Sequence, residues 1–201
     1  HLSEQTEEIA WVKALFPEAR DYPDTYERAG LVGPGAVFGH AIHLTDREKA
    51  RLREADASLV HCPTSNTFIG SGLFDLAGLS TGGHRIGLAT DTGGGSSFSM
   101  LRTMAAAYEV AQLRGTAIHP SALWWLATIG SARALRADHL IGNLVPGMEA
   151  DIVVLDLAST AAIAQRAAQA NDIWEALFPT IMMGDDRAIH AAWIGGRTTK
   201  G

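Results

Sequence analysis

Cysteine is nearly absent from this chain: of its 201 residues, only Cys62 is a cysteine. One thiol cannot form a disulfide framework within the chain, and it cannot build a zinc cluster held by several thiolates. It also excludes the class of zinc deaminase that binds its metal through a Cys-x-x-Cys pair. Any metal site in this chain must therefore rely mainly on other ligands.

Long apolar runs and clusters of basic residues are missing as well. No run approaches the roughly 18 apolar residues that span a bilayer, and no signal peptide opens the chain, so we expect a cytoplasmic protein without a membrane partner. The 16 Lys and Arg residues are scattered, and the formal net charge is −6. This charge pattern argues against a nucleic-acid partner. An initiator Met is also lacking, and we interpret the start at His1 as the sign of a fragment or a processed chain.

Short apolar segments alternate with amphipathic ones along residues 1–142. The composition predicts strands at 36–40, 58–61 and 85–90, and helices at 3–16, 45–55, 72–79, 97–114 and 122–129. The helix from Thr45 is marked by a capping box, because Glu48 follows three residues later. Strands alternating with helices predict parallel βαβ units and an α/β fold.

A polar residue stands at the end of each predicted strand. These residues are His40, His61 and Asp91, and His1 follows a further strand that we infer just before it. In a (β/α)8 barrel the catalytic groups lie at the C-terminal ends of the strands. The four side chains are therefore candidates to share one site.

The pattern changes after Gly142. A turn is predicted at 145–151, followed by a strand at 152–155, a helical stretch at 161–178 and a last strand at 188–194 before a Gly-Gly turn signal. We therefore divide the chain into a first domain, 1–142, and a second segment, 143–201, that forms part of a small β-rich domain with C-terminal helices.

Two histidines and two carboxylates suggest a metal site: His1, Glu4, His40 and Asp91. Zinc binds imidazole nitrogen and carboxylate oxygen, and a catalytic zinc lowers the pKa of its water from about 15.7 to near 7. Glu4 lies one helical turn from His1, near enough to move protons. Spacing alone leaves the alternatives open, since a strand-end histidine is often structural and Asp91 precedes a glycine-rich turn.

Several motifs resemble the deaminases of the metal-dependent amidohydrolase superfamily. His1-Leu2-Ser3-Glu4 resembles the His-x-x-Glu signature after the fifth barrel strand, and residues 37–40 resemble the sixth strand with its histidine. Residues 61–66 are similar to the loop after strand seven, residues 87–91 to strand eight with its aspartate, and residues 141–151 to the start of the small β-domain. The resemblance implies the C-terminal half of a (β/α)8 TIM barrel, strands five to eight, with part of a small β-rich domain.

The resemblance also implies roles for the site residues. His1, His40 and Asp91 would bind one zinc ion, with iron as the alternative metal. Asp91 would also accept a proton, His40 would polarise or orient the hydroxide, and Glu4 would donate a proton to a purine ring nitrogen. His61 and Asn66 are candidates for substrate contact, and a structural role at the strand end is the alternative for both.

Two segments are similar to the guanine-deaminating members of that superfamily: residues 93–100 after the aspartate, and the Pro-x-x-Tyr around Pro23 and Tyr26. They imply hydrolysis of a small purine, guanine, to xanthine and ammonia, and a homodimer. The alternatives are another amidohydrolase, acting on a triazine, a pterin or an oxidised purine, and a catalytically inert chain. Inertness is kept open because the His-x-His pair that supplies two further metal ligands in the family does not occur in this sequence.

Overall fold

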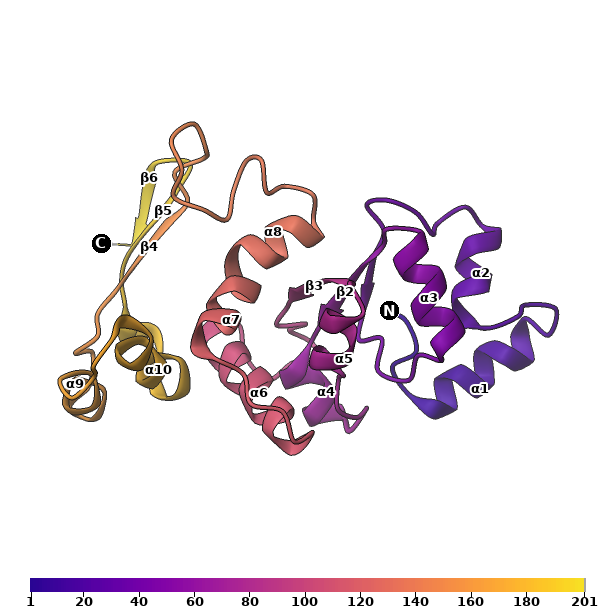
Figure 1. Ribbon diagram of the computed structural model, residues 1–201, viewed down its shortest axis with the longest axis horizontal. Helices are drawn as coiled ribbons and strands as arrows, with labels where there is room; N and C mark the ends of the chain where they lie inside the picture. Colours follow the sequence, from indigo (N-terminus) through magenta and orange to yellow (C-terminus); the bar gives the residue numbers. More distant parts are fainter. Residues whose placement is uncertain (201) are drawn as a thin grey trace.

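Two separate sheets organise the protein, whose computed structural model describes residues 1–200, with side chains to residue 199. A parallel sheet lies in the middle of the molecule, and an antiparallel sheet lies at the C-terminal end, far from the N-terminal helices α1, α2 and α3 (Figure 1). The predicted α/β character is therefore confirmed. In the described part of the chain, no helix is long and apolar enough to cross a membrane.

The parallel sheet has the order β1-β2-β3 and follows the chain. Its strands are β1 (Val37–Gly39), β2 (Ser58–His61) and β3 (Arg85–Leu88). All three predicted strands are present, although β1 and β3 are shorter than expected. Leu2 forms an isolated parallel bridge with His40, so the segment around His1 continues the sheet on the side of β1.

Helices connect and cover these strands. Their bounds are α1 (Thr6–Leu15), α2 (Tyr22–Arg28), α3 (Asp46–Glu54), α4 (Pro63–Ile69), α5 (Leu76–Thr81), α6 (Met100–Leu113), α7 (Pro120–Trp125), α8 (Ser131–Ala134), α9 (Ala161–Ala167) and α10 (Ile173–Met183). A π-helical turn, η1 (Leu126–Gly130), joins α7 to α8. The capping box of α3 is confirmed, since the Thr45 side chain accepts a bond from the Glu48 backbone and the Glu48 carboxylate accepts one from the Thr45 backbone.

The helix predicted at 161–178 and the loop expected after β2 differ from the structure. The stretch predicted at 161–178 is two helices, because the Asp172 carboxylate accepts bonds from the backbone of Trp174 and Glu175 and so begins a new helix, α10. The segment after β2, which the resemblance describes as a loop, forms the short helix α4 with Pro63 in its first turn.

The main core lies on one face of the parallel sheet. Phe38, Leu59 and Ile86 are in register on neighbouring strands and are buried together with Leu52 of α3 and Leu79 of α5. Burial of each such side chain contributes about 1.5–3 kcal/mol to stability. The core therefore fixes the strands from one side and holds their C-terminal ends at one edge.

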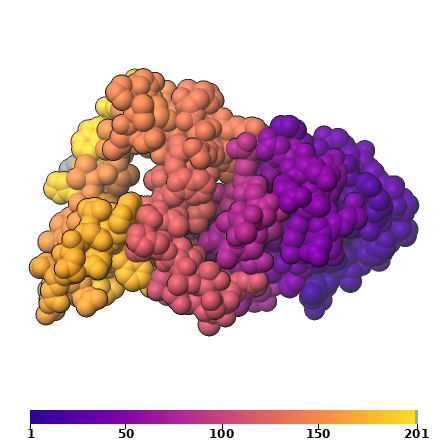
Figure 2. Space-filling view, in the orientation of Figure 1, coloured from indigo at the N-terminus to yellow at the C-terminus, as the bar shows by residue number. Residues whose placement is uncertain are grey.

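The antiparallel sheet has the order β4-β5-β6. Its strands are β4 (Ile152–Leu155), β5 (Ile189–Ile194) and β6 (Arg197–Lys200), and a short 3-10 helix, η2 (Asp186–Ala188), precedes β5. Gly195 and Gly196 both have positive φ, which a two-residue hairpin turn between β5 and β6 requires. The surface is hollowed between this sheet and the middle helices (Figure 2), where a cavity of about 500 Å³ is lined by Trp124, Ile152 and Leu177, among others.

Candidate metal centre

Four predicted site residues converge at the C-terminal edge of the parallel sheet. Ligand atoms of His1, Glu4 and His40 lie within 4.8 Å of one another, and those of His40, Cys62 and Asp91 do the same. His40 belongs to both groups and is therefore the centre of the cluster. The sequence predicted this gathering for every member except Cys62.

The backbone turns sharply at the residues that form the cluster. His40 has φ 68° and Asp91 has φ 48°, values in the left-handed region that residues other than glycine rarely adopt. Such a conformation costs on the order of 1–3 kcal/mol and persists only where the surroundings hold it. At His40 two bonds do so: its N–H donates to the Val60 carbonyl at 3.1 Å, and the next N–H, of Ala41, donates to the Leu2 carbonyl at 2.9 Å.

The His40 imidazole is buried, with 1% of its side chain exposed, and each ring nitrogen faces a different partner. Nδ1 lies 2.9 Å from the Asn66 Oδ1 and 3.6 Å from the Glu4 Oε1. Nε2 lies 3.8 Å from the Asp91 Oδ2. The His40 ring also packs against the His1 ring in a T-shaped arrangement, with perpendicular ring planes and centroids 4.8 Å apart.

The two carboxylates are more accessible than the histidine at the centre. Glu4 is 14% exposed and Asp91 26% exposed. The Ser71 hydroxyl donates to the Glu4 Oε1 at 2.7 Å and so holds this carboxylate beside His40. Both carboxylates can therefore exchange protons with a molecule at the edge of the sheet while the ring stays in place.

Cys62 is the residue of this cluster that sequence reasoning did not expect. Its position directly after β2 was the available signal, because β1 and β3 end near the same edge. Burial raises the pKa of the Cys62 thiol to about 12, and the nearby Asp91 carboxylate adds to the effect. The thiol is therefore protonated at neutral pH, which fits a buried small residue better than a nucleophile.

His61 and Asn66, the predicted substrate contacts, are both buried. The His61 ring stacks on Phe74 with centroids 4.6 Å apart, and neither ring nitrogen has a hydrogen-bond partner among the described residues. Burial lowers the pKa of His61 to about 3, so the ring is neutral. Direct contact of His61 or Asn66 with a substrate stays a prediction, and the structure gives Asn66 a different partner, His40.

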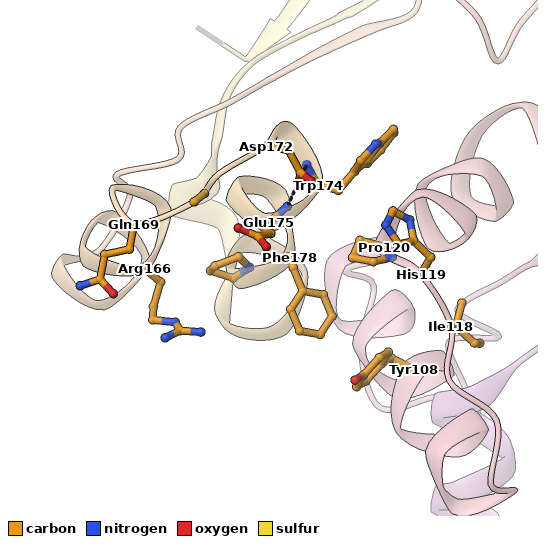
Figure 3. Close-up of a pocket in the computed structure, with 12 residues that line it drawn as sticks. Tyr108, Ile118, His119, Pro120, Arg166, Gln169, Asp172, Trp174, Glu175 and Phe178 are labelled. Atoms are coloured by element: carbon orange, nitrogen blue, oxygen red, sulfur yellow. Dashed lines mark hydrogen bonds between the residues drawn. The ribbon is translucent and has the colours of Figure 1, made fainter.

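One surface hollow reaches this cluster, and a larger one lies away from it. A cavity of about 330 Å³ on the sheet face opposite the core is lined by Val60, Cys62 and Asp91, among others, and so reaches the cluster. A hollow of about 520 Å³ lies between α6 and the α9–α10 pair (Figure 3), and its lining includes none of the predicted site residues. Its carboxylates Asp172 and Glu175 accept bonds from nearby backbone groups, which gives them a local structural role.

The donor set of the cluster fits a zinc-type ion. Imidazole nitrogen and carboxylate oxygen are the ligands that zinc prefers besides thiolate. Ligand atoms on one zinc ion lie about 3–4 Å apart, as their bond lengths of about 2 Å require. Within each of the two groups the ligand atoms already lie within 4.8 Å of one another, so small side-chain rotations would bring either group to one ion, and His40 is the residue that joins the two.

Comparison with known proteins adds an independent line of support. The amidohydrolase family profile matches residues 1–199. The chain is 42% identical over 197 residues to guanine deaminase of Escherichia coli K12, covering 98% of this chain and 45% of that protein. It is 40% identical over 199 residues to a probable guanine deaminase of Deinococcus radiodurans, with the same two coverages.

Solved structures agree with these sequence matches. The E. coli guanine deaminase structure superposes with a TM-score of 0.97 at 41% identity, covering 99% of this chain and 47% of that one. A guanine deaminase from C. acetobutylicum with guanine bound in its active site superposes with a TM-score of 0.88 at 26% identity, covering 98% and 47%. The chain thus spans about half the length of the curated relatives it matches.

Proposed function

The chain belongs to the amidohydrolase family, and from this premise we propose that it forms part of the active site of a guanine deaminase, which hydrolyses guanine to xanthine and ammonia. The observation that carries the proposal is the convergence of the His1 imidazole and two carboxylates on the His40 imidazole at one sheet edge. Identity of 40–42% to a guanine deaminase and a probable one supports guanine as the substrate.

We further propose that β1, β2 and β3 correspond to strands six, seven and eight of a (β/α)8 barrel, with the segment that ends at His1 as strand five. Their parallel order along the chain supports this numbering. Residues 1–142 would then form the barrel part. Residues 143–201, with the antiparallel sheet, would form a segment of a small β-rich domain. The homodimer remains an expectation from the resemblance.

The residues that would bind the metal are His1, His40 and Asp91, with zinc as the proposed ion and iron as the alternative. When bound, the metal supplies a water whose pKa is near 7 instead of about 15.7. The family's His-x-His pair, which provides two further ligands, does not occur in this sequence. We therefore expect this chain by itself to bind the ion weakly.

The chain's own side chains would move the protons. Water adds to C2 of guanine, the bond from C2 to the amino nitrogen breaks, and ammonia leaves. The Asp91 Oδ2 accepts a proton from the attacking water and passes it to the amino nitrogen, which leaves as ammonia, and the His40 Nε2, which faces Asp91, orients that water. Glu4 delivers a proton to the adjacent ring nitrogen from a carboxyl group that the Ser71 hydroxyl holds in place, and it regains a proton from the added hydroxyl as the C2 carbonyl of xanthine forms. Such general acid–base steps contribute about 10²–10⁴-fold to a rate.

The test is ammonia release from guanine by this chain, with zinc added and bound metal measured, beside the variant Glu4→Gln. We expect Glu4→Gln to lose about 10²–10⁴-fold in rate while it retains its metal. Glu7→Gln, at an exposed position in α1, is the matched control and should leave the rate unchanged. Equal rates in the wild type and Glu4→Gln would contradict the role of Glu4.

Two other results would favour the alternatives. Ammonia released from a triazine, a pterin or an oxidised purine, but not from guanine, would change the substrate and keep the reaction. Absence of both metal and ammonia would mean that this chain is inert by itself, and that its place in the family describes its ancestry.

A further inference from the structure

We propose that Asn66 is a positioning residue that fixes the proton of the His40 ring on Nδ1 and leaves Nε2 free at the sheet edge. The contact that carries the inference is the 2.9 Å distance from the His40 Nδ1 to the Asn66 Oδ1, between two side chains that are almost completely buried. The catalytic meaning of this role rests on the proposed function, whereas its structural content does not.

Hydrogen-bond geometry decides between the two neutral forms of the ring. A neutral imidazole has one N–H donor and one acceptor nitrogen. The Asn66 Oδ1 only accepts, so Nδ1 must carry the proton that it receives. The competing contact, from the His40 Nε2 to the Asp91 Oδ2, is 3.8 Å long and is not a hydrogen bond. The lone pair of Nε2 is therefore available to a metal ion or to a proton of water.

Helix α4 holds Asn66 in the orientation that this bond needs. The Asn66 N–H donates to the Cys62 carbonyl at 2.9 Å, and its carbonyl accepts from Gly70 at 3.1 Å and Ser71 at 2.8 Å. Gly70 ends the helix with φ 81°, which turns the chain so that the Ser71 hydroxyl reaches the Glu4 carboxylate. One short helix thus orients both the ring at the centre and the carboxylate beside it.

The other half of the amide argues against a purely structural role. The Asn66 Nδ2 is buried and has no partner among the described residues. An unpaired buried donor costs about 1–3 kcal/mol, so packing alone favours an apolar side chain of similar size at this position. The amide oxygen is useful here because it specifies which nitrogen of His40 is protonated, a task that an apolar group cannot perform.

The first experiment is ¹⁵N NMR of the histidine rings in the wild-type chain without metal, at mildly alkaline pH. The His40 signals are assigned by their loss in His40→Gln. We expect a protonated Nδ1 and an unprotonated Nε2. A proton on Nε2 would overturn the inference, because it would mean that the amide is turned round and Nδ2 donates to the ring. This measurement needs neither guanine nor turnover, so it is independent of the proposed function.

The second experiment compares three variants by the same spectra and by zinc affinity in competition with a chromophoric chelator. Asn66→Leu removes the acceptor, and we expect loss of the single Nδ1–H form and a 10–100-fold weaker affinity. Asn66→Asp retains an acceptor oxygen and should keep both properties. Thr67→Ala changes an exposed residue on the same helix and is the matched control.

Each result either supports or overturns the positioning role. An Asn66→Leu variant with unchanged His40 tautomer and unchanged zinc affinity would overturn it. If Asn66→Leu does not fold, as judged by circular dichroism, the wild-type tautomer and the Asn66→Asp spectrum decide. If the wild type binds no measurable zinc, the tautomers alone decide. A chain that releases no ammonia but shows the expected tautomers would refute the proposed function and leave the role of Asn66 intact.

Discussion

The free energy of unfolding should decrease as the pH is lowered into the mildly acidic range, because one buried ring, that of His61, resists protonation in the folded chain. Burial lowers the pKa of His61 in the folded chain from 6.5 to about 3. The unfolded chain exposes the ring, which then binds a proton below about pH 6.5, whereas the folded chain does not. The unfolded state thus binds more protons as the pH falls, so the free energy of unfolding decreases in the window between about 6.5 and 3.

The magnitude follows from the width of that window. Each pH unit below 6.5 costs about 1.4 kcal/mol, so lowering the pH from 7 to about 5 should remove about 2 kcal/mol from the free energy of unfolding. This is a large share of the 5–15 kcal/mol that typical domains possess. The ring has no hydrogen-bond partner in the described structure that could offset the cost of charging it.

The assay is urea unfolding at both pH values, followed by tryptophan fluorescence, with the variant His61→Phe beside the wild type. Phenylalanine can keep the stacked contact with Phe74 and cannot titrate. The variant should lose about 2 kcal/mol less than the wild type between the two pH values, whatever its stability at pH 7. His84→Gln is the control, because burial also lowers the pKa of this partly buried ring but should change the slope less. Wild-type and His61→Phe stabilities that fall in parallel would refute the reasoning.

Two further predictions concern the core and the loop after β3. Phe74→Ala should lower the free energy of unfolding by about 3–5 kcal/mol, measured by the same urea titration, because Phe74 is 1% exposed and its removal leaves a cavity. Gly95→Ala should weaken zinc affinity measured with a chelator, because a Cβ at this position would lie 2.0 Å from the Thr90 carbonyl oxygen and 3.0 Å from that of Asp91, and the loop that carries Asp91 would have to shift. Unchanged zinc affinity in a folded Gly95→Ala would contradict this account of the loop.

Much of the fold was predictable because the apolar patterns and capping motifs of the sequence agree with the positions of its buried strands and helix ends. The buried strands carry apolar residues, and β2 begins and ends where it was expected. The capping box of α3 is a local motif with a defined geometry, and it forms as predicted. By contrast, α2 was missed, although Asp21 and Pro23 mark its start, and β6 was missed because its four residues show no apolar pattern.

Helix α4 illustrates why part of the site could not be foreseen. Its residues 63–69 include threonine, serine and asparagine, which favour turns and caps over helix interiors. The segment becomes helical through tertiary contacts: the Thr64 hydroxyl donates to the Thr90 carbonyl, and the Asn66 side chain binds His40. The resemblance places Asn66 in a loop and makes it a candidate substrate contact, and the local propensities give no sign of the helix or of its contact with the ring.

The site itself combines a predictable position with an unpredictable backbone. The placement of His40 and Asp91 at one edge follows from the parallel order of strands and needs only the apolar pattern of the sequence. Their left-handed φ values have only a weak local signal, because Asp and His enter this region more often than most side chains but neither residue is a glycine. A fold that held these residues only for packing would gain stability by relaxing them. Of the six described non-glycine residues with positive φ, four are His40, Asp91 and the sequence neighbours Ser3 and Ala41, so most of this strain lies beside the gathered donor atoms.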